Sequence, residues 1–554
     1  MKMILGKYNL PNYYVTKLQR TFQRFSFAPT GGVHKQLLRI KAMITAYMVE
    51  INKKKIKLYF IKLRKLRKDI QRPKSFKKKQ FMLNPTLFKV SIRVYKKLFT
   101  IIILQFFIQT IGNAQFPHIT GKLNLNIQKG TLEGDFELSN LPTINNYYIS
   151  LNSGLNIRYF RNEKDNFNYY YNKEYGDSTP AGCFGYYFRN NTGKGKFLPH
   201  TFQISYTGAF PVISDTLKAS DSGDWAGNIA CNGKTIRATD QSAWYPILYD
   251  IEKDIKYTKI IYDIEVTCDD CEDIYLNGNT PIKGKYAHLK SDSAFALLLF
   301  AGNYNIDTSN NTYFLNTDMT KKQLTEFGKM TNSYKKYYEK ELSIPYIYNI
   351  TYLQTTPTSK YNGFLFVTYP SITAVGWDNG FKGCFGENGN SFKPFIAHEL
   401  GHYYFGNYAK YNSELGHTID ESFSEFLSLK VTEYFLRDSI YNSKIDNDIR
   451  ILNDFNPISI GYVISGSDIK NNQIYNYSYF PIVLVAIEKE IGKEKMWKWL
   501  NLILTTKTEF TNYEFLKNTL RIALKDNELL EKIEKKYFKS KESLKNAIST
   551  IRQK

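Results

Sequence analysis

The stretch Ser391-Phe-Lys-Pro-Phe-Ile-Ala-His398-Glu399-Leu-Gly-His402, followed after eighteen residues by Glu421, constrains this chain more than any other feature. On a helix, His398 and His402 lie one turn apart on the same face, and Glu399 lies beside them. Two imidazoles and one carboxylate make a three-ligand zinc site with a fourth position open for water or substrate. The pattern therefore predicts a catalytic zinc centre with Glu399 as its general base.

Two acidic residues downstream of the histidines each allow a second interpretation. The segment Thr418-Ile-Asp-Glu421 matches a helix-capping box, in which the glutamate would bond a backbone amide. The spacing from the histidine pair nevertheless favours Glu421 as the third ligand. Glu425 lies one turn further along the same helix, where it could accept the ring N–H of a ligating histidine or remain an exposed surface residue.

The positive charge of the chain is confined to its N-terminal segment. Residues 1–97 hold 26 of the 75 Lys and Arg but only two of the 51 acidic residues, and residues 98–114 hold no charged side chain. Equal numbers of basic and acidic residues remain in the rest of the chain. The folded part therefore gives no electrostatic reason to expect a nucleic-acid partner.

An apolar run, Leu98 to Ile111, follows Lys96-Lys97 and leads into the small residues Gly112-Asn113-Ala114. This run is short for a membrane span and has no positive charge after it, so it predicts a signal peptide over 82–114. An uncleaved membrane anchor is the alternative. Because a signal peptide should open a chain, we interpret the basic segment 1–81 as an over-extended start that translation from Met82 would omit. We thus expect the protein to be exported, without a stable membrane span in the mature chain.

Residues 115–316 show short alternating or aromatic-rich runs separated by Gly, Asn and Asp. This pattern predicts a β-sandwich or a saddle-shaped sheet. The expected strands include 121–127, 134–138, 202–206, 259–267 and 295–301. The five cysteines are odd in number and scattered, which excludes a disulfide scaffold. For Cys268-Asp-Asp-Cys271 we expect a local disulfide or two free thiols rather than a metal site.

The hydrophobic period changes near Asp318, and residues 317–554 are expected to form a mainly helical domain with a small sheet. The fold class is therefore α+β. The expected helices are 319–340, one that starts near Ser391 and has Pro394 in its first turn, 419–437, 482–490 and 493–505, and the expected strands are 346–353 and 363–369.

The zinc pattern resembles that of the gluzincin metallopeptidases of the aminopeptidase N family. The histidine pair, the eighteen-residue spacing and the segment Glu421-Ser-Phe-Ser-Glu-Phe carry the resemblance. It implies a saddle domain over 115–316 and a thermolysin-like zinc catalytic domain over 317–554, without the large helical C-terminal domain of many members. The metzincin pattern, by contrast, is absent, because Phe405 and Tyr408 stand where that pattern requires Gly and His.

The resemblance also implies a tyrosine that stabilises the oxyanion of the tetrahedral intermediate. Tyr477 stands fifteen residues before Gly492, as in the family, and Tyr475 and Tyr479 are alternatives in the same segment. Family exopeptidases further bind the substrate amine through a Gly-x-Met-Glu-Asn segment. Its nearest match here is 375–380, which would make Asp378 the substrate-binding residue; a turn without a ligand is the alternative.

The combined prediction is a zinc-dependent peptidase that acts on peptides, most simply as an aminopeptidase that holds one Zn²⁺. The incomplete match around Asp378 leaves a secreted endopeptidase open. A zinc-loaded but catalytically silent peptide-binding protein is a third possibility, against which the intact Glu399 argues.

Overall fold

The structure is a computed structural model that describes residues 116–172, 182–190, 193, 195–213, 226–355, 364–375, 380–387 and 389–553. The segments expected as an over-extended start and a signal peptide lie outside the described residues, and so does Asp378. Among the described helices, none combines the length and the hydropathy needed to cross a bilayer.

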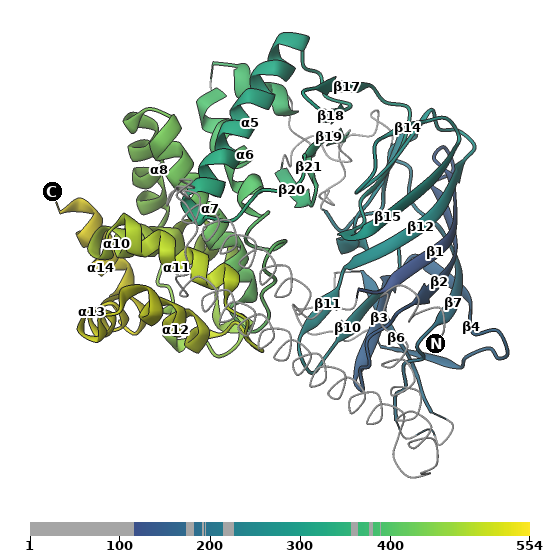
Figure 1. Ribbon diagram of the computed structural model, residues 1–554, viewed down its shortest axis with the longest axis horizontal. Helices are drawn as coiled ribbons and strands as arrows, with labels where there is room; N and C mark the ends of the chain where they lie inside the picture. Colours follow the sequence, from purple (N-terminus) through teal and green to yellow (C-terminus); the bar gives the residue numbers. More distant parts are fainter. Residues whose placement is uncertain are drawn as a thin grey trace, which may run out of the picture. The chain divides into compact units, whose positions relative to one another are not determined.

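Three sheets form the N-terminal part of the described chain (Figure 1). The first has the order β15-β12-β1-β2-β7-β4, in which only β1 and β12 pair in parallel. Its strands are β1 His118–Asn126, β2 Thr131–Ser139, β4 Leu155–Arg161, β7 Phe202–Ala209, β12 Lys259–Cys268 and β15 Tyr286–Ala296. Along β12 every second residue is buried, as expected for a strand with one face on a core.

The other two sheets of this part have five strands each. One has the order β11-β10-β3-β6-β5, with β3 Tyr147–Asn152, β5 Tyr169–Asn172, β6 Cys183–Phe188, β10 Ile247–Asp250 and β11 Ile255–Tyr257. The other has the order β14-β13-β16-β9-β8, with β8 Ala230–Cys231, β9 Thr235–Ala238, β13 Asp273–Leu276, β14 Ile282–Lys283 and β16 Leu299–Gly302. These strands confirm the expected β-rich N-terminal part.

The local disulfide expected as one of two states of the CxxC segment is present between Cys268 and Cys271. Within the same loop, Asp270 accepts backbone hydrogen bonds from Ile127 and Gln128 at 2.9 and 2.8 Å. The bridged loop thus holds the turn between β1 and β2. Because both sulfurs are bonded to each other, this cysteine pair is not available as a metal-ligand pair.

A fourth sheet leads into the helical part, with the order β17-β18-β19-β21-β20. Its strands are β17 Ile306–Ser309, β18 Thr312–Leu315, β19 Thr351–Thr355, β20 Phe364–Thr368 and β21 Ser371–Val375. Strand β18 pairs in parallel with β19, although α5 (Lys321–Leu342) separates them in the sequence. The domain boundary expected at residue 316 therefore falls between two neighbouring strands of one sheet.

The remaining described chain is mostly helical. After α5 come α6 Gly389–Gly401, α7 Gly416–Phe435, α8 Asp438–Ile451, α9 Asn472–Ile474, α10 Phe480–Ile491, α11 Lys493–Thr505, α12 Tyr513–Leu524, α13 Asn527–Ile533 and α14 Ser543–Arg552. Helix α5 begins with a capping box formed by Thr320 and Gln323. One large apolar core joins this sheet and these helices, and a separate core fills the N-terminal sheets. The expected α+β fold is confirmed.

Several expected element boundaries were wrong. The run 295–301 is not one strand, because β15 ends at Ala296 and β16 begins at Leu299. The strand expected over 346–353 is limited to β19, which begins at Thr351. In the segment before Thr351, Tyr346, Tyr348 and Ile350 pack on the helical core and the residues between them are exposed, so the segment has the alternation of a strand without pairing.

A buried hydrogen-bond network joins the N-terminal sheets to the turn between β20 and β21. Asn277 is the residue that follows β13. Its side chain is fully buried and donates a hydrogen bond to the backbone oxygen of Thr368 at 2.6 Å. Its own oxygen accepts a hydrogen bond from Ser371 at 2.6 Å and another from Tyr275 at 3.2 Å. Because unpaired buried polar groups are costly, this network fixes the β20–β21 hairpin against the N-terminal part.

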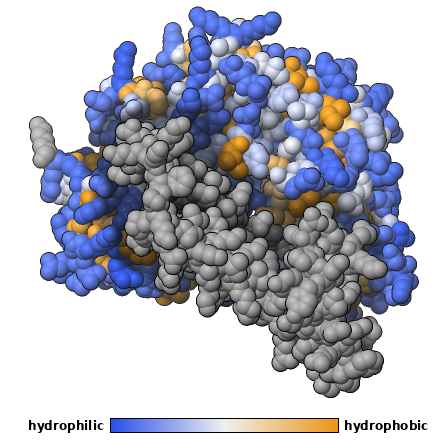
Figure 2. Space-filling model, viewed as in Figure 1, coloured by the Kyte–Doolittle hydropathy of each residue, from blue (hydrophilic) through white to orange (hydrophobic). Residues whose placement is uncertain are grey.

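The visible described surface is predominantly hydrophilic, and apolar residues form small separate areas on it (Figure 2). This distribution agrees with the equal numbers of acidic and basic residues after position 97. Small scattered apolar areas of this kind are ordinary on a protein surface.

An ion-pair cluster at the end of α10 makes stability pH-dependent. Burial alone would raise the pKa of Glu490, but hydrogen bonds from Lys532, Lys536 and Tyr537 outweigh it and lower the pKa to about 2. A carboxyl whose pKa is lowered on folding stabilises the protein above its unfolded pKa, and this stabilisation is lost as the pH falls towards the folded pKa. Because the partner lysines are partly exposed, solvent screening reduces the effect, and we expect Glu490→Gln to lower the free energy of unfolding by ~2 kcal/mol at pH 7.

The check is urea unfolding of both proteins at pH 7, 5 and 3.5. The difference should be constant between pH 7 and about pH 5.5 and should shrink below it, because the carboxylate of the unfolded wild-type chain then begins to gain its proton while the folded one stays ionised. Glu494→Gln, an exposed site on α11, is the matched control. A difference that is the same at pH 7 and 3.5 would contradict the electrostatic explanation.

Candidate metal centre

Helices α6 and α7 pack against each other and carry the histidine pair and Glu421 (Figure 1). Gly401 is the point of close approach, because a Cβ there would lie 3.2 Å from the Cα of Ser424. A larger residue would push the helices apart. The glycine thus allows the last turn of α6 to bring His402 to the first turns of α7.

Three potential ligand atoms converge between these helices. The Nε2 atoms of His398 and His402 lie 3.0 Å apart, and Oε2 of Glu421 lies 3.3 and 3.4 Å from them. Ligand atoms bound tetrahedrally to zinc at ~2.0–2.2 Å are roughly 3.3–3.6 Å from one another. The two distances to the carboxylate oxygen lie in this range and the distance between the nitrogens is slightly shorter, so small side-chain adjustments would fit a zinc ion. These three residues form the possible metal cluster among the described histidines, cysteines and acids outside the CxxC loop.

The outer ring nitrogens of both histidines face hydrogen-bond acceptors. His398 Nδ1 lies 2.8 Å from Oε2 of Glu425. His402 Nδ1 lies 3.0 Å from Oδ1 of Asp420 and 3.1 Å from the backbone oxygen of Phe405. An acceptor at Nδ1 holds the ring proton there and leaves the Nε2 lone pair free for a metal. Of the two interpretations of Glu425, the structure has the one in which it contacts a histidine.

Asp420 is a site residue that the sequence analysis missed. The available signal was its place immediately before Glu421 on the same helix; the two carboxylates lie at opposite ring nitrogens of His402. Gly406 makes room for it, because a Cβ on that residue would come 2.4 Å from Asp420 Oδ1, and its φ of +113° is one that glycine adopts readily.

The protonation equilibria of the site are strongly perturbed. Burial lowers the pKa of His398, but hydrogen bonds with Glu421 and Glu425 outweigh it and raise the pKa to about 9. Burial raises the pKa of Glu399, and the nearby imidazoles only partly oppose this effect. A buried carboxyl with a raised pKa, close to a possible metal, is suited to accept a proton and release it again.

Tyr477 points to the same centre. Its hydroxyl donates to Oε2 of Glu421 at 2.7 Å, and burial together with the charge of Glu421 raises its pKa, so that the phenol stays protonated. The two alternatives point elsewhere: Tyr475 donates to the backbone of Ile458 and Tyr479 to Ser543. Residues 475–479 form a single π-helical turn, a local irregularity that is common at functional sites.

The capping-box alternative for Glu421 is excluded. The helix begins at Gly416 instead of the expected Ile419, so Thr418 lies inside α7 and its hydroxyl donates to Asn476 at 2.9 Å. The helix of the histidines likewise begins earlier than expected, at Gly389, which places Pro394 in its interior. Here the backbone oxygen of Pro394 accepts a hydrogen bond from Ser428 of α7 at 2.7 Å. Local sequence rules cannot predict such a tertiary contact.

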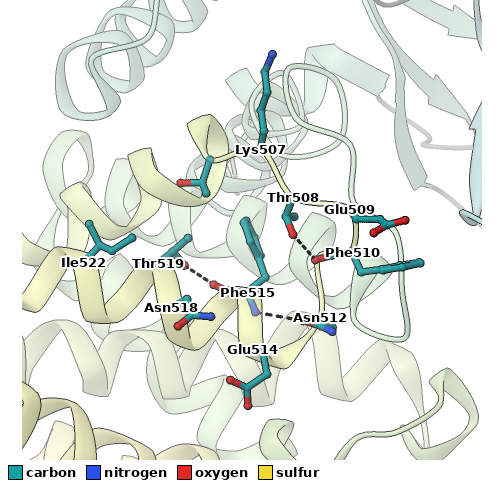
Figure 3. Close-up of a pocket in the computed structure, with 11 residues that line it drawn as sticks. Lys507, Thr508, Glu509, Phe510, Asn512, Glu514, Phe515, Asn518, Thr519 and Ile522 are labelled. Atoms are coloured by element: carbon teal, nitrogen blue, oxygen red, sulfur yellow. Dashed lines mark hydrogen bonds between the residues drawn. The ribbon is translucent and has the colours of Figure 1, made fainter.

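A separate cavity lies on the helical part, between α12 and the loop before it (Figure 3). Its volume is about 340 Å³. The lining residues are Thr506, Lys507, Thr508, Glu509, Phe510, Asn512, Glu514, Phe515, Asn518, Thr519 and Ile522. They include no histidine or cysteine, so this cavity lacks the donor set of a catalytic zinc site.

No model of a known protein family matches the sequence, and no curated protein matches it significantly. Solved structures do. An M1 zinc metallopeptidase from Deinococcus radiodurans, in a variant bound to a Tyr-Ser-Ala substrate, matches with a TM-score of 0.53 and 12% identity, over 75% of this chain and 92% of that one. Yeast LTA4 hydrolase in complex with bestatin matches with a TM-score of 0.50 and 12% identity, over 76% and 67%. The chain therefore has the fold of M1 zinc metallopeptidases.

Proposed function

We propose that this protein is a zinc-dependent peptidase. The observation that carries the proposal is the convergence of His398 Nε2, His402 Nε2 and Glu421 Oε2 beside the buried Glu399. The fold adds support, since a solved M1 zinc metallopeptidase of the same fold is bound to a tripeptide substrate.

The three convergent residues would hold one zinc ion. Zinc bound there would supply Lewis acidity, which makes water a better nucleophile and polarises a peptide carbonyl at neutral pH. Glu399 would take a proton from the attacking water and give it to the leaving amine nitrogen. Glu425 and Asp420 would keep the ring protons of His398 and His402 on Nδ1 throughout.

Tyr477 would donate a hydrogen bond to the oxyanion that forms when the carbonyl is attacked. This bond would replace its present hydrogen bond to Glu421. We expect Tyr477→Phe to lower kcat by about 10²-fold with little change in KM, because the bond is made only in the transition state. Steady-state kinetics on one peptide checks this. Tyr475→Phe is the control, because that hydroxyl bonds Ile458 instead; an equal loss of activity in both variants would contradict the role of Tyr477.

Within this activity we propose an aminopeptidase, with Asp378 as the group that pairs with the substrate amine. One described feature favours an endopeptidase as a second candidate. Strand β20 is the last strand of the described fourth sheet, packs against α6, and consists of Phe364-Leu-Phe-Val-Thr368, without a carboxylate. An edge strand can bind an extended peptide through its backbone, whether or not a free amine is near.

The test uses the zinc-loaded protein on one set of peptides with free and with acetylated N-termini, and Glu399→Gln as the blank. Cleavage of the free set alone, one residue at a time, would establish an aminopeptidase, and Asp378→Asn should then raise KM. Internal cleavage of both sets would establish an endopeptidase. Zinc binding without cleavage of any peptide would refute the peptidase and favour the silent peptide-binding protein.

We further propose that the protein is exported and that cleavage follows Ala114. The support is the sequence of residues 82–114 alone. N-terminal sequencing of the protein from the cell envelope or medium should give a chain that begins at Gln115. A chain that begins before Met82 would contradict both the signal peptide and the over-extended start.

A further inference from the structure

A chain of buried charges lies behind His398 and continues away from the metal centre. Glu425 contacts His398 Nδ1 through Oε2 at 2.8 Å, and its other oxygen, Oε1, lies 2.6 Å from the ammonium of Lys444 on α8. That ammonium also lies 3.7 Å from Asp448, one turn further along the same helix. The described contacts therefore connect α6, α7 and α8 through one line of charged side chains.

We propose that Lys444 is a positioning residue: by holding the far oxygen of Glu425, it keeps the near oxygen aligned on His398 and so strengthens zinc binding. The inference rests on the proposed zinc site. It adds a residue that neither the zinc pattern nor the spacing to Glu421 contains, because Lys444 lies on a different helix and 42 residues after the second histidine.

The geometry gives Lys444 this role for a physical reason. A glutamate with a partner at only one oxygen can rotate about its terminal bond and tilt the imidazole to which it is hydrogen-bonded. Here each oxygen has its own partner, and the carboxylate is buried with 6% of its surface exposed. Removing the cation would leave a buried carboxylate with its charge uncompensated, which favours a different side-chain position or the entry of water.

Asp448 in turn restrains Lys444. Its carboxylate is buried and accepts a hydrogen bond from Ser478 at 3.4 Å, within the π-helical turn that carries Tyr477. The ammonium thus lies between two carboxylates from two helices. This arrangement restricts the lysine side chain, whose many rotamers would otherwise make it a poor anchor.

A purely structural role for Lys444 would be to attach α8 to α7, and the chain offers a control for that role. Lys430 on α7 is also buried and forms ion pairs with Glu488 at 2.7 Å and with Glu433. Neither of these acids contacts a proposed zinc ligand among the described interactions. Loss of Lys430 should therefore lower stability without changing the affinity of the folded protein for zinc.

The experiment measures the zinc dissociation constant of the full-length protein by competition with a chromophoric chelator at pH 7.5, together with the thermal unfolding of each metal-free variant. We expect Lys444→Met to weaken zinc binding by ~10-fold and Asp448→Asn by a smaller factor. Lys444→Arg should restore most of the affinity, and Lys430→Met should leave it unchanged although its unfolding temperature falls. Asp448→Asn provides the test if Lys444→Met does not fold.

Two results would overturn the inference: wild-type affinity in a folded Lys444→Met protein, or an equal loss of affinity in Lys430→Met. A separate assay of peptide cleavage distinguishes a failure of the Lys444 inference from a failure of the proposed function. A wild-type protein that cleaves peptides while Lys444→Met keeps full zinc affinity refutes only the role of Lys444. A wild-type protein that binds no zinc refutes the proposed function and, with it, this inference.

Discussion

Replacement of Glu399 by glutamine is expected to lower kcat for peptide hydrolysis by about 10³-fold while zinc binding stays unchanged. Glutamine has the size of glutamate but cannot accept a proton from water at neutral pH. Glu399 lies next to His398 in sequence, is buried, and has a pKa raised by burial, so the change removes a base without removing a proposed ligand. This variant should therefore lose activity and keep its zinc affinity.

The measurement is kcat on a single peptide, with zinc content determined on the same samples. Glu414→Gln is a suitable control, because it changes one carboxyl to an amide in the loop between α6 and α7 and leaves the centre intact. Near-wild-type turnover by Glu399→Gln would refute the mechanism. A loss of zinc together with activity would instead assign Glu399 to metal binding.

The second large effect is expected for Glu421→Gln, which should weaken zinc binding by at least ~10²-fold. This loss is larger than the one expected for Lys444→Met or Asp448→Asn. The carboxylate supplies the only negative charge among the three convergent groups, and its Oε2 lies within 3.4 Å of both ring nitrogens. An amide oxygen carries no net charge, and two neutral imidazoles would remain to hold a divalent ion.

Equilibrium dialysis against buffered zinc measures this effect directly. His417→Asn is the matched control, because that imidazole lies 3.9 Å from Glu421 Oε1 yet is largely exposed and belongs to no convergent set. Retention of tight zinc binding by Glu421→Gln would show that Glu421 is not a ligand. A loss of zinc in His417→Asn of similar size would show that the ligand set is larger than three.

The sequence predicted the parts of the site that depend on spacing within one helix. His398 and His402 share a face because four residues make about one turn, and Glu425 lies beside His398 because it follows Glu421 by one turn. The α+β class was also predictable, since alternating strands and helical periods are local properties. Tyr477 could be placed among 44 tyrosines only through a family resemblance.

Features that depend on contacts between distant segments could not be predicted. The start of α7 at Gly416 follows from tertiary packing, in which Thr418 bonds Asn476, and the local sequence offered a capping box instead. The position of Asp420 before Glu421 was a signal, but its contact with His402 also needs Gly406, where a Cβ would collide with the Asp420 carboxylate. Lys444 reaches Glu425 from a third helix, and no pattern of spacing joins them.

The hydrogen bonds of Asn277 have a consequence for any attempt to divide this protein. A fragment that begins at residue 317 would lack β17 and β18 and expose the edge of β19. It would also leave the backbone oxygen of Thr368 without its donor and the Ser371 hydroxyl without its acceptor. Buried groups that lose their partners cost about 1–3 kcal/mol each. The apolar cores should therefore melt in one cooperative transition, and the helical part should be insoluble when produced alone.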